Sequence, residues 1–510
     1  MLSSRCHDMR QRGTTTCVQQ DPGITGISEA TAPHLNRGAP ACSLPDELYN
    51  KIFKIHANPY PAFSQIVTFS HVCSRWRSAC ISTPSLWSHI QVAFPFQREG
   101  RLTEIRARLE RSTGSLLDAE LGFDSEYIDQ ASIDAVISML RPHLTRIKRL
   151  RISGKFWGNK LFLSCFPLPK GMDHLEYLSV ELIIYDHIAP CDITGIWNQA
   201  EDVLPSLRTF NLDVYSFRMV PPFLLTPVKL PSLRNLSVVG AVPAEAISFL
   251  VDESKDKLEA LVLRAPWGTG ISTIINSPLP APRLREIQIG YLSLMNFHSV
   301  DWSTQVLEHV LSIEFVDNGL TNIGMHRDYV TVLNNFLDHA CFPSLRKFFI
   351  PATRGYRDSS LVSFLERHMD LLHFGMYIQE YLAHRFTIRS ITGALARSTS
   401  MFGKLQLITF IGLRPPFNTF ATDFLELLQE MMERVQERGR SPSASSVDVP
   451  CLSDSRRSIN TVPFKITIKI RTWDSTGVCH ELIKLAATYP SNLVIEVIPK
   501  LHMRPDSFEF

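Results

Sequence analysis

A short apolar unit that recurs along most of the chain constrains the fold more than any other feature. Each copy has an apolar residue, two other residues, a second apolar residue, one other residue and a third apolar residue. Four regular copies are Leu207-Phe210-Leu212, Leu233-Leu236-Val238, Leu258-Leu261-Leu263 and Leu284-Ile287-Ile289. Their first residues are 25 or 26 residues apart. A period of this length is typical of repeat proteins, in which each copy adds one structural unit to a stack.

Looser copies extend the array on both sides. They are Leu144-Ile147-Leu150-Ile152, Leu175-Leu178-Val180, Ile313-Phe315, Leu345-Phe348-Ile350 and Leu405-Ile408-Phe410. The segments LPSLRTFNL, LPSLRNLSV and FPSLRKFFI are near copies of one another. Alternate apolar residues predict a short strand with one buried face, and one such strand cannot bury that face alone. The sequence therefore predicts that the copies stack side by side.

The pattern and spacing of these copies resemble leucine-rich repeats. The resemblance implies an α/β fold in which residues 141–510 form an irregular leucine-rich-repeat solenoid. The copies depart from that family where the strand ends, because the usual Asn or Cys is missing. The segment Asp213-Val214-Tyr215-Ser216 follows one copy, and Val239-Gly240-Ala241-Val242 follows the next. The array is therefore degenerate, and its spacing loosens after about residue 350.

Residues 43–92 carry a different pattern, with three short helical segments. Pro45 falls in the first turn of the first segment, where its missing N–H is not needed. Leu48, Ile52 and Ile55 then recur at helical spacing and give that helix an apolar face. The second segment has apolar residues at helical spacing, namely Ile66, Phe69, Val72 or Cys73, Trp76 and Cys80. So short a module buries little surface, and we expect it to lean on a partner or on the rest of the chain.

Three motifs in this stretch resemble the F-box in order and spacing. They are Leu44-Pro45-Asp46-Glu47-Leu48, Val72-Cys73-Ser74-Arg75-Trp76 and Leu86-Trp87. The resemblance implies a three-helix F-box at residues 42–92 that docks on the small adaptor subunit of cullin–RING ubiquitin ligases. The adaptor-binding residues that it implies are Leu44, Pro45, Leu48, Ile52, Val72, Trp76, Leu86 and Trp87. The alternative is an ordinary three-helix bundle in which Trp76 and Trp87 belong to the core.

The two features together resemble the substrate receptors of SCF-type ubiquitin ligases, specifically fungal-type F-box proteins with degenerate leucine-rich repeats. The resemblance implies that the F-box holds the adaptor and that the repeats hold a target protein. Strand geometry places the residues that alternate with the core on the opposite face of the sheet. The target-binding candidates on that face are Arg149, Arg151, Tyr177, Ser179, Thr209, Asn211, Asp213, Asn235, Ser237, Arg264, Glu286 and Gln288.

Other interpretations of the same sequence stay open. The candidates on the strands can be merely solvated, with a loop or an end of the array binding the target instead. The chain can also be a leucine-rich-repeat interaction scaffold with no part in a ligase, in which the N-terminal helices cap the array. A third possibility is an enzyme within the irregular half after residue 350.

The remaining segments complete the domain organisation. Residues 1–41 are rich in Ser, Thr, Gly, Pro and Arg without periodic apolar residues, which predicts a disordered tail. Residues 93–140 are expected to form a helical linker, with a charged helix near 98–111. Residues 438–460 have the composition of a disordered insertion within the solenoid. Ser441 and Ser458 in that insertion stand in contexts that resemble kinase substrates.

Charge and composition limit the kinds of binding partner and the cellular compartment that we expect for this protein. A formal net charge of +2 gives no bulk electrostatic attraction to nucleic acid or to an anionic membrane. No run of eighteen apolar residues is present, so no transmembrane helix is predicted. The 10 cysteines include no pair with CxxC spacing, which excludes the usual zinc motifs. Free thiols are typical of a reducing compartment, so we expect the cytoplasm or the nucleus.

Catalytic motifs are missing from the sequence. His326-Arg327-Asp328 resembles part of a kinase catalytic loop, but Leu333 stands where that family needs an asparagine. The phosphate-binding loop, the dinucleotide fingerprint, the nucleophile elbow and the HExxH zinc motif do not occur. We therefore expect no catalysis by this chain and no cofactor or metal.

Overall fold

The chain divides into two compact units, unit 1 (Met1–Leu86) and unit 2 (Trp87–Phe510). The computed structural model describes residues 44–56, 63–94, 100–123, 130–156, 172–184, 204–216, 229–240, 244–264, 282–290, 307–316, 327–352, 357–378, 404–413, 425–426, 428–429, 432–433, 465–471 and 484–498. The predicted disordered tail and the predicted disordered insertion, with Ser441 and Ser458, lie outside these residues.

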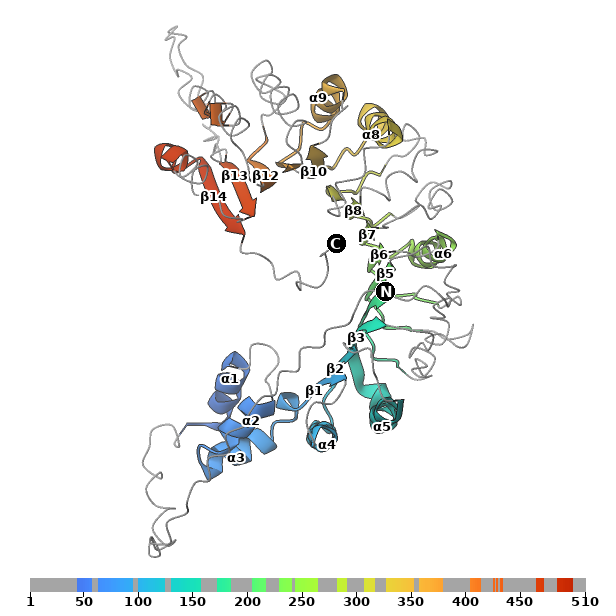
Figure 1. Ribbon diagram of the computed structural model, residues 1–510, viewed down its shortest axis with the longest axis vertical. Coiled ribbons are helices and arrows are strands. Elements are labelled where there is room, and N and C mark those ends of the chain that lie inside the picture. The colour runs from blue at the N-terminus through green and yellow to red at the C-terminus, as the bar shows by residue number, and fades with distance from the viewer. Residues whose placement is uncertain are drawn as a thin grey trace, which may run out of the picture. The chain divides into compact units, whose positions relative to one another are not determined.

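Unit 1 is helical in its described part (Figure 1). Its elements are α1 (Asp46–His56), α2 (Phe63–Ser70), α3 (Ser74–Ile81) and the 3₁₀ turn η2 (Pro84–Leu86). The Pro45 carbonyl accepts the N–H groups of Leu48 and Tyr49 at 3.0 and 3.3 Å, which starts α1 directly after the proline. The Cys73 sulfur accepts the N–H of Trp76 at 3.5 Å and caps α3.

Unit 2 is a mixed α/β structure built on one parallel sheet. Its described strands are β1 (His89–Phe94), β2 (Leu117–Phe123), β3 (Ile147–Phe156), β4 (Tyr177–Ile184), β5 (Thr209–Ser216), β6 (Asn235–Gly240), β7 (Ala260–Arg264), β8 (Glu286–Gly290), β9 (Ser312–Val316), β10 (Lys347–Ala352), β11 (His373–Ile378), β12 (Leu407–Leu413), β13 (Lys465–Arg471) and β14 (Leu493–Ile498). These strands pair in chain order, each parallel to the next. The sheet therefore grows by one strand for each copy of the apolar unit.

Helices connect some of the strands and cover one side of the sheet. The described helices of unit 2 are α4 (Arg101–Arg111), α5 (Gln130–Leu140), η3 (Arg141–Arg146), α6 (Ala244–Ser254), α8 (Arg327–His339) and α9 (Asp358–Arg367). Those labelled in Figure 1 lie on the same side of the row of strands. Buried helix residues such as Ile105, Ile247 and Phe336 join the strand residues in one apolar cluster. This packing leaves the other side of the sheet without helices among the described residues.

The repeated apolar unit explains this core. Its second and third apolar residues lie on the strand and pair with the equivalent residues of the next unit, so that Phe210 pairs with Leu236 and Leu212 with Val238. Its first apolar residue lies in the turn before each strand and is also buried, as at Leu207 and Leu233. The near-identical PSL segments form the same turn, in which the leucine N–H bonds the carbonyl three residues earlier.

The sheet begins earlier in the chain than the sequence indicated. Residues 93–140, expected to be a helical linker, contain β2 as well as α4 and α5, and β1 lies at the end of the stretch expected to be F-box. In β2, Leu117, Ala119, Leu121 and Phe123 are buried on alternate positions. The small residues Ala119 and Gly122 make this alternation weak as a sequence pattern, so the sequence did not predict the strand.

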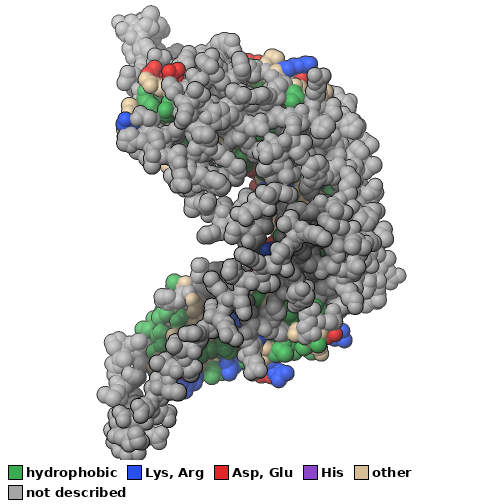
Figure 2. Space-filling view, viewed as in Figure 1, with side chains coloured by type: hydrophobic (Ala, Val, Ile, Leu, Met, Phe, Trp, Pro, Cys, Tyr) green, Lys and Arg blue, Asp and Glu red, His purple; other side chains and the backbone are tan. Residues whose placement is uncertain are grey.

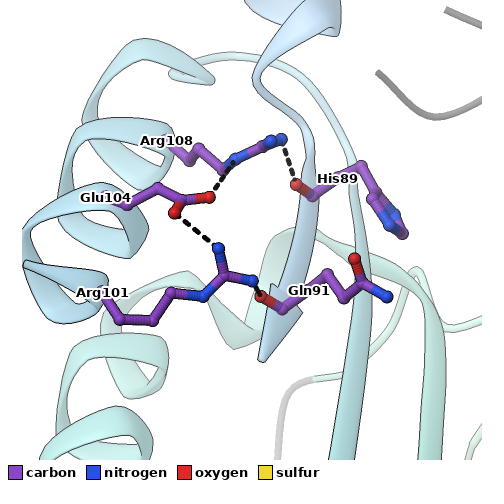
Figure 3. A network of polar contacts seen from close by, with 5 residues as sticks. All are labelled: His89, Gln91, Arg101, Glu104 and Arg108. Carbon is purple, nitrogen blue, oxygen red and sulfur yellow. Dashed lines mark hydrogen bonds and ion pairs between the residues drawn. The ribbon is translucent and has the colours of Figure 1, made fainter. Parts of the chain in front are cut away.

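Helix α4 protects the outer edge of β1. The Ser88 carbonyl accepts the N–H of Asp118 in β2, so the carbonyls of His89 and Gln91 point to the opposite edge. Arg108 donates to the His89 carbonyl at 2.7 Å and Arg101 to the Gln91 carbonyl at 2.8 Å (Figure 3). Glu104 ties the two arginines together, at 2.5 Å from Arg101 and 3.5 Å from Arg108. The network thus caps an edge that could otherwise pair with another chain.

Replacing Arg108 by methionine is expected to loosen β1. Arg108 is 4% exposed, and its loss leaves the His89 carbonyl without this donor, at a cost of about 2–4 kcal/mol. Burial, together with the charge of Arg108, lowers the pKa of His89 to about 4. The variant should therefore also raise the pKa of His89, which an NMR titration measures. Arg106→Met, at an exposed position of the same helix, is the control; equal hydrogen exchange of residues 89–94 in both variants would contradict the prediction.

Candidate functional site

The predicted target-binding residues lie together on one face of the sheet, which we call the non-core face. It is formed by the strand residues that alternate with the buried rows. Arg149, Tyr177, Thr209 and Asn235 occupy one row across β3 to β6. Arg151, Ser179, Asn211 and Ser237 occupy the next row. Asp213, Arg264, Glu286 and Gln288 extend the same face, so the sequence placed all of these residues on a common surface.

Contacts between strands order part of this face. The Arg149 guanidinium lies 4.7 Å from the centre of the Tyr177 ring, within the range of a cation–π contact. The Asn211 amide donates to the Tyr177 hydroxyl at 3.0 Å. The Asn235 amide likewise donates to the Thr209 hydroxyl at 3.2 Å. Tyr177 is thus held from both sides, and its ring has a fixed position on the face.

Charged pairs lie beside this ordered region. Arg151 donates to Glu181 at 2.6 and 3.1 Å, and Ser179 donates to the same carboxylate oxygen at 3.3 Å. Burial lowers the pKa of Arg151, but the hydrogen bond and charge of Glu181 outweigh it and leave the pKa raised. Arg264 donates to the side chain of Gln288 at 2.7 Å. Ser179 is 1% exposed and offers no surface of its own, whereas both partners of the Arg151–Glu181 pair reach solvent.

Unit 1 is held by a cluster of aromatic rings. Phe53 lies 5.1 Å from Phe69 and 5.3 Å from Trp76 between ring centres, and Tyr49 lies 5.7 Å from Trp76. Tyr49 and Phe53 are fully buried. These rings come from α1, α2 and α3, so one cluster joins all three helices. The sequence analysis did not identify Tyr49 and Phe53, although their spacing of four residues on α1 was the available signal.

A neighbouring stripe of α1 is apolar and largely exposed. Leu48 is 41% and Ile55 77% exposed, and Ile52 between them is half-buried. Val72 before α3 and Ile81 at its end are 45% and 47% exposed. Figure 2 shows hydrophobic side chains gathered over this helical region. Among the described residues, only two other large apolar side chains are exposed to this degree, Leu116 and Met369, so the exposed apolar side chains concentrate in unit 1.

The comparison with protein families found a match in this part of the chain. Residues 41–92 match the family model of F-box-like domains. The chain carries an F-box-like domain. The matched stretch includes the described part of unit 1 and the beginning of β1, and it agrees with the F-box expected at residues 42–92 from the three sequence motifs. F-box domains bind the adaptor subunit of cullin–RING ligases and act as adaptor modules rather than enzymes. The chain as a whole matched no curated protein.

The adaptor-binding candidates of the F-box-like domain fall into three groups. Pro45, Leu48 and Val72 are exposed. Leu44, Ile52 and Trp76 are half-buried, and Trp76 also packs in the aromatic cluster. Leu86 and Trp87 are buried, and Arg111 lies 4.4 Å over the Trp87 ring. The exposed group is the part of the candidate set that a partner can reach directly.

Reactive chemistry is not evident in the part of the chain that the structure describes. Burial raises the pKa of the Cys80 thiol to about 11, so this cysteine serves as a small apolar residue in the core. No group of three or more His, Cys, Asp or Glu side chains within the described ranges could hold a metal ion. None of the described helices has the length and apolar character to cross a bilayer.

Proposed function

We propose that this protein is the substrate-recognition subunit of an SCF-type cullin–RING ubiquitin ligase. The F-box-like domain binds the adaptor subunit, and the non-core face of unit 2 binds a target protein. In this proposal unit 2 is a degenerate leucine-rich-repeat solenoid of the kind found with fungal-type F-box domains. The protein acts in the cytoplasm or nucleus and has no catalytic residues of its own.

The observation that carries the proposal is the exposed apolar stripe of the F-box-like domain. Leu48 and Ile55 on α1, with Val72 and Ile81 around α3, leave apolar area in water within a module of few residues. Removing such area from water is favourable by about 25 cal/mol for each Å², from which the entropy cost of association is subtracted. A partner that covers this stripe would also stabilise a module too small to bury much surface by itself.

The target-binding part of the proposal is supported by the order of the non-core face. Tyr177 is fixed by Arg149 and Asn211, and aromatic and arginine side chains are the usual anchors of protein interfaces. Because their positions are set before binding, little conformational entropy is lost when a target docks.

The mechanism of such a subunit is proximity. Holding target and ligase on one chain converts transfer of ubiquitin from a chance encounter into a reaction at an effective concentration of about a millimolar. The chemistry would belong to the other subunits of the ligase. What this chain contributes is the choice of target and the geometry in which it is presented.

Changing both Leu44 and Pro45 to alanine is expected to abolish co-purification of the adaptor subunit and the cullin with the full chain. Pro45 is exposed at the start of α1, and its carbonyl remains available to α1 in the alanine variant. Helix α1 should therefore still form. Unit 2 contains neither residue and should keep its fold, which hydrogen exchange of the strands can verify.

Two outcomes would count against the ligase. Undiminished adaptor binding by the double variant would show that Leu44 and Pro45 are not part of the adaptor contact. If neither adaptor nor cullin co-purifies with the wild-type chain while a chain without residues 43–92 still binds its other partners, the protein is an interaction scaffold. Proximity labelling in the presence of a proteasome inhibitor would identify the targets whose labelling depends on the non-core face.

A further inference from the structure

The non-core face continues beyond the predicted candidates into an aromatic cluster on β10 and β11. The Phe349 ring lies 4.7 Å from His373 and 5.9 Å from Tyr377 between ring centres. The Lys347 amino group lies 4.8 Å over the Phe349 ring, and the Tyr377 hydroxyl donates to Glu314. The sequence predictions did not include this cluster, although Leu371-Phe374-Met376 repeats the apolar unit 26 residues after Leu345-Phe348-Ile350.

A glycine makes room for the cluster. Gly375 lies opposite Phe349 in the register of β10 and β11, and a Cβ on Gly375 would be 2.1 Å from the Phe349 ring. The ring therefore lies across β11 where a side chain would otherwise stand. Phe349 is 4% exposed although it belongs to the non-core face. It forms a fixed floor, and His373 and Tyr377 flank it two residues before and after Gly375.

The row of residues beside this floor has an ordered chemical pattern. Lys347 pairs with His373, His373 with Leu407, and Leu407 with Lys465, on four successive strands. Two lysines thus bracket an imidazole and an apolar side chain. Three strand spacings separate the lysines by about 14 Å, which matches four residues of an extended peptide at about 3.3 Å each.

The charges on this part of the face favour an anionic partner. Lys347 is 41% and Glu314 only 19% exposed at the side chain, and Glu314 is already engaged by Tyr377 and Lys347. Lys465 is exposed. The other acidic residue that the structure describes at a non-core position of β9 to β14 is Glu496, which lies in the third row and not in the row of the two lysines. The accessible charge in the row of Lys347 and Lys465 is therefore positive.

We propose that β10 to β13 bind an extended acidic segment of the target protein, with an apolar side chain between two carboxylates. The carboxylates pair with Lys347 and Lys465, and the apolar side chain lies on His373 and Leu407. Side chains at alternate positions of an extended chain face the same side, so the segment reads acidic, any residue, apolar, any residue, acidic. This inference rests on the proposed target-binding role of the non-core face and adds the class of target.

Fluorescence anisotropy with the purified full chain tests the proposal. The probe is a fluorescein-labelled peptide with the core Glu-Ser-Leu-Ser-Glu, and the reference probe has the core Lys-Ser-Leu-Ser-Lys. The acidic probe should bind at least about tenfold more tightly than the basic one, and Lys347→Glu with Lys465→Glu should remove that preference. Lys255→Glu with Lys257→Glu makes the same charge change at exposed positions after α6 and should leave binding unchanged. Lys465→Glu alone, which leaves the Lys347–Glu314 pair in place, should weaken binding as well.

The possible outcomes separate this inference from the proposed function. The acidic-segment site would be overturned if the two probes bind equally or if the acidic probe does not bind. It would also be overturned if Lys465→Glu, alone and together with Lys347→Glu, leaves binding undiminished. The proposed function would then still stand if the adaptor and the labelled targets are retained. If instead the wild-type chain binds the acidic probe but recruits no adaptor, the ligase role falls and the peptide site remains.

Discussion

Replacing Leu48 by aspartate is expected to abolish adaptor binding while unit 1 keeps its fold. Leu48 is 41% exposed, on the side of α1 away from the aromatic cluster, so the carboxylate stays in water in the free protein. In a complex it would be buried against apolar surface without a partner. That burial costs about 4 kcal/mol, or about a thousandfold in Kd. Calorimetric titration of the full chain with purified adaptor measures the change.

Two further variants separate contact from stability. Phe53→Ala removes a fully buried ring that contacts Phe69 and Trp76, at a cost of about 3–5 kcal/mol. It should lose adaptor binding together with the hydrogen-exchange protection of residues 46–56. Leu116→Asp changes a residue of similar exposure in unit 2 and should bind normally. Normal binding by Leu48→Asp would show that the exposed stripe of α1 is not the adaptor contact.

For helix α1 in unit 1, the sequence predicted one apolar stripe and missed a second one. The spacing of Leu48, Ile52 and Ile55 correctly indicated an apolar face, and Leu48 also belongs to the first of the three family motifs. Sequence alone did not reveal that α1 has a second apolar stripe, Tyr49 and Phe53, and that this one is the core. The choice depends on which stripe faces the other helices, and helical periodicity does not decide that.

In unit 2 the repeated unit predicted strand positions and the buried rows well, because one apolar pattern specifies both. It also placed the non-core candidates on a common face. The contacts among them, such as Arg149 with Tyr177, depend on the register between strands and could not be predicted from the sequence. The first strands were missed because small residues such as Ala119 obscure the period, whereas β11 was missed although Leu371-Phe374-Met376 continues the repeated unit there.

Replacing Gly240 by alanine is expected to open the sheet between β5 and β6. Gly240 has φ of 97°, and a Cβ at this position would lie 1.7 Å from the carbonyl oxygen of Val214 on the neighbouring strand. Neither strand can move away, because each is also paired on its other side. Backbone strain and the steric clash together should cost about 3–5 kcal/mol. Hydrogen exchange of residues 209–216 and 235–240 in the full chain measures the loss locally, which suits a repeat array in which unfolding need not be two-state.

Gly114 provides the matched control, since it shares the positive φ but not the close neighbour. Its φ is 85°, and no heavy atom lies within 4 Å of the position of a Cβ. Gly114→Ala should therefore carry only the conformational cost, about 1 kcal/mol, and leave β5 and β6 protected. If both variants exchange alike, the approach of Val214 contributes nothing and φ alone explains the glycine. A large difference would mean that this position accepts only glycine because the backbone of Val214 on the preceding strand occupies the place of a side chain.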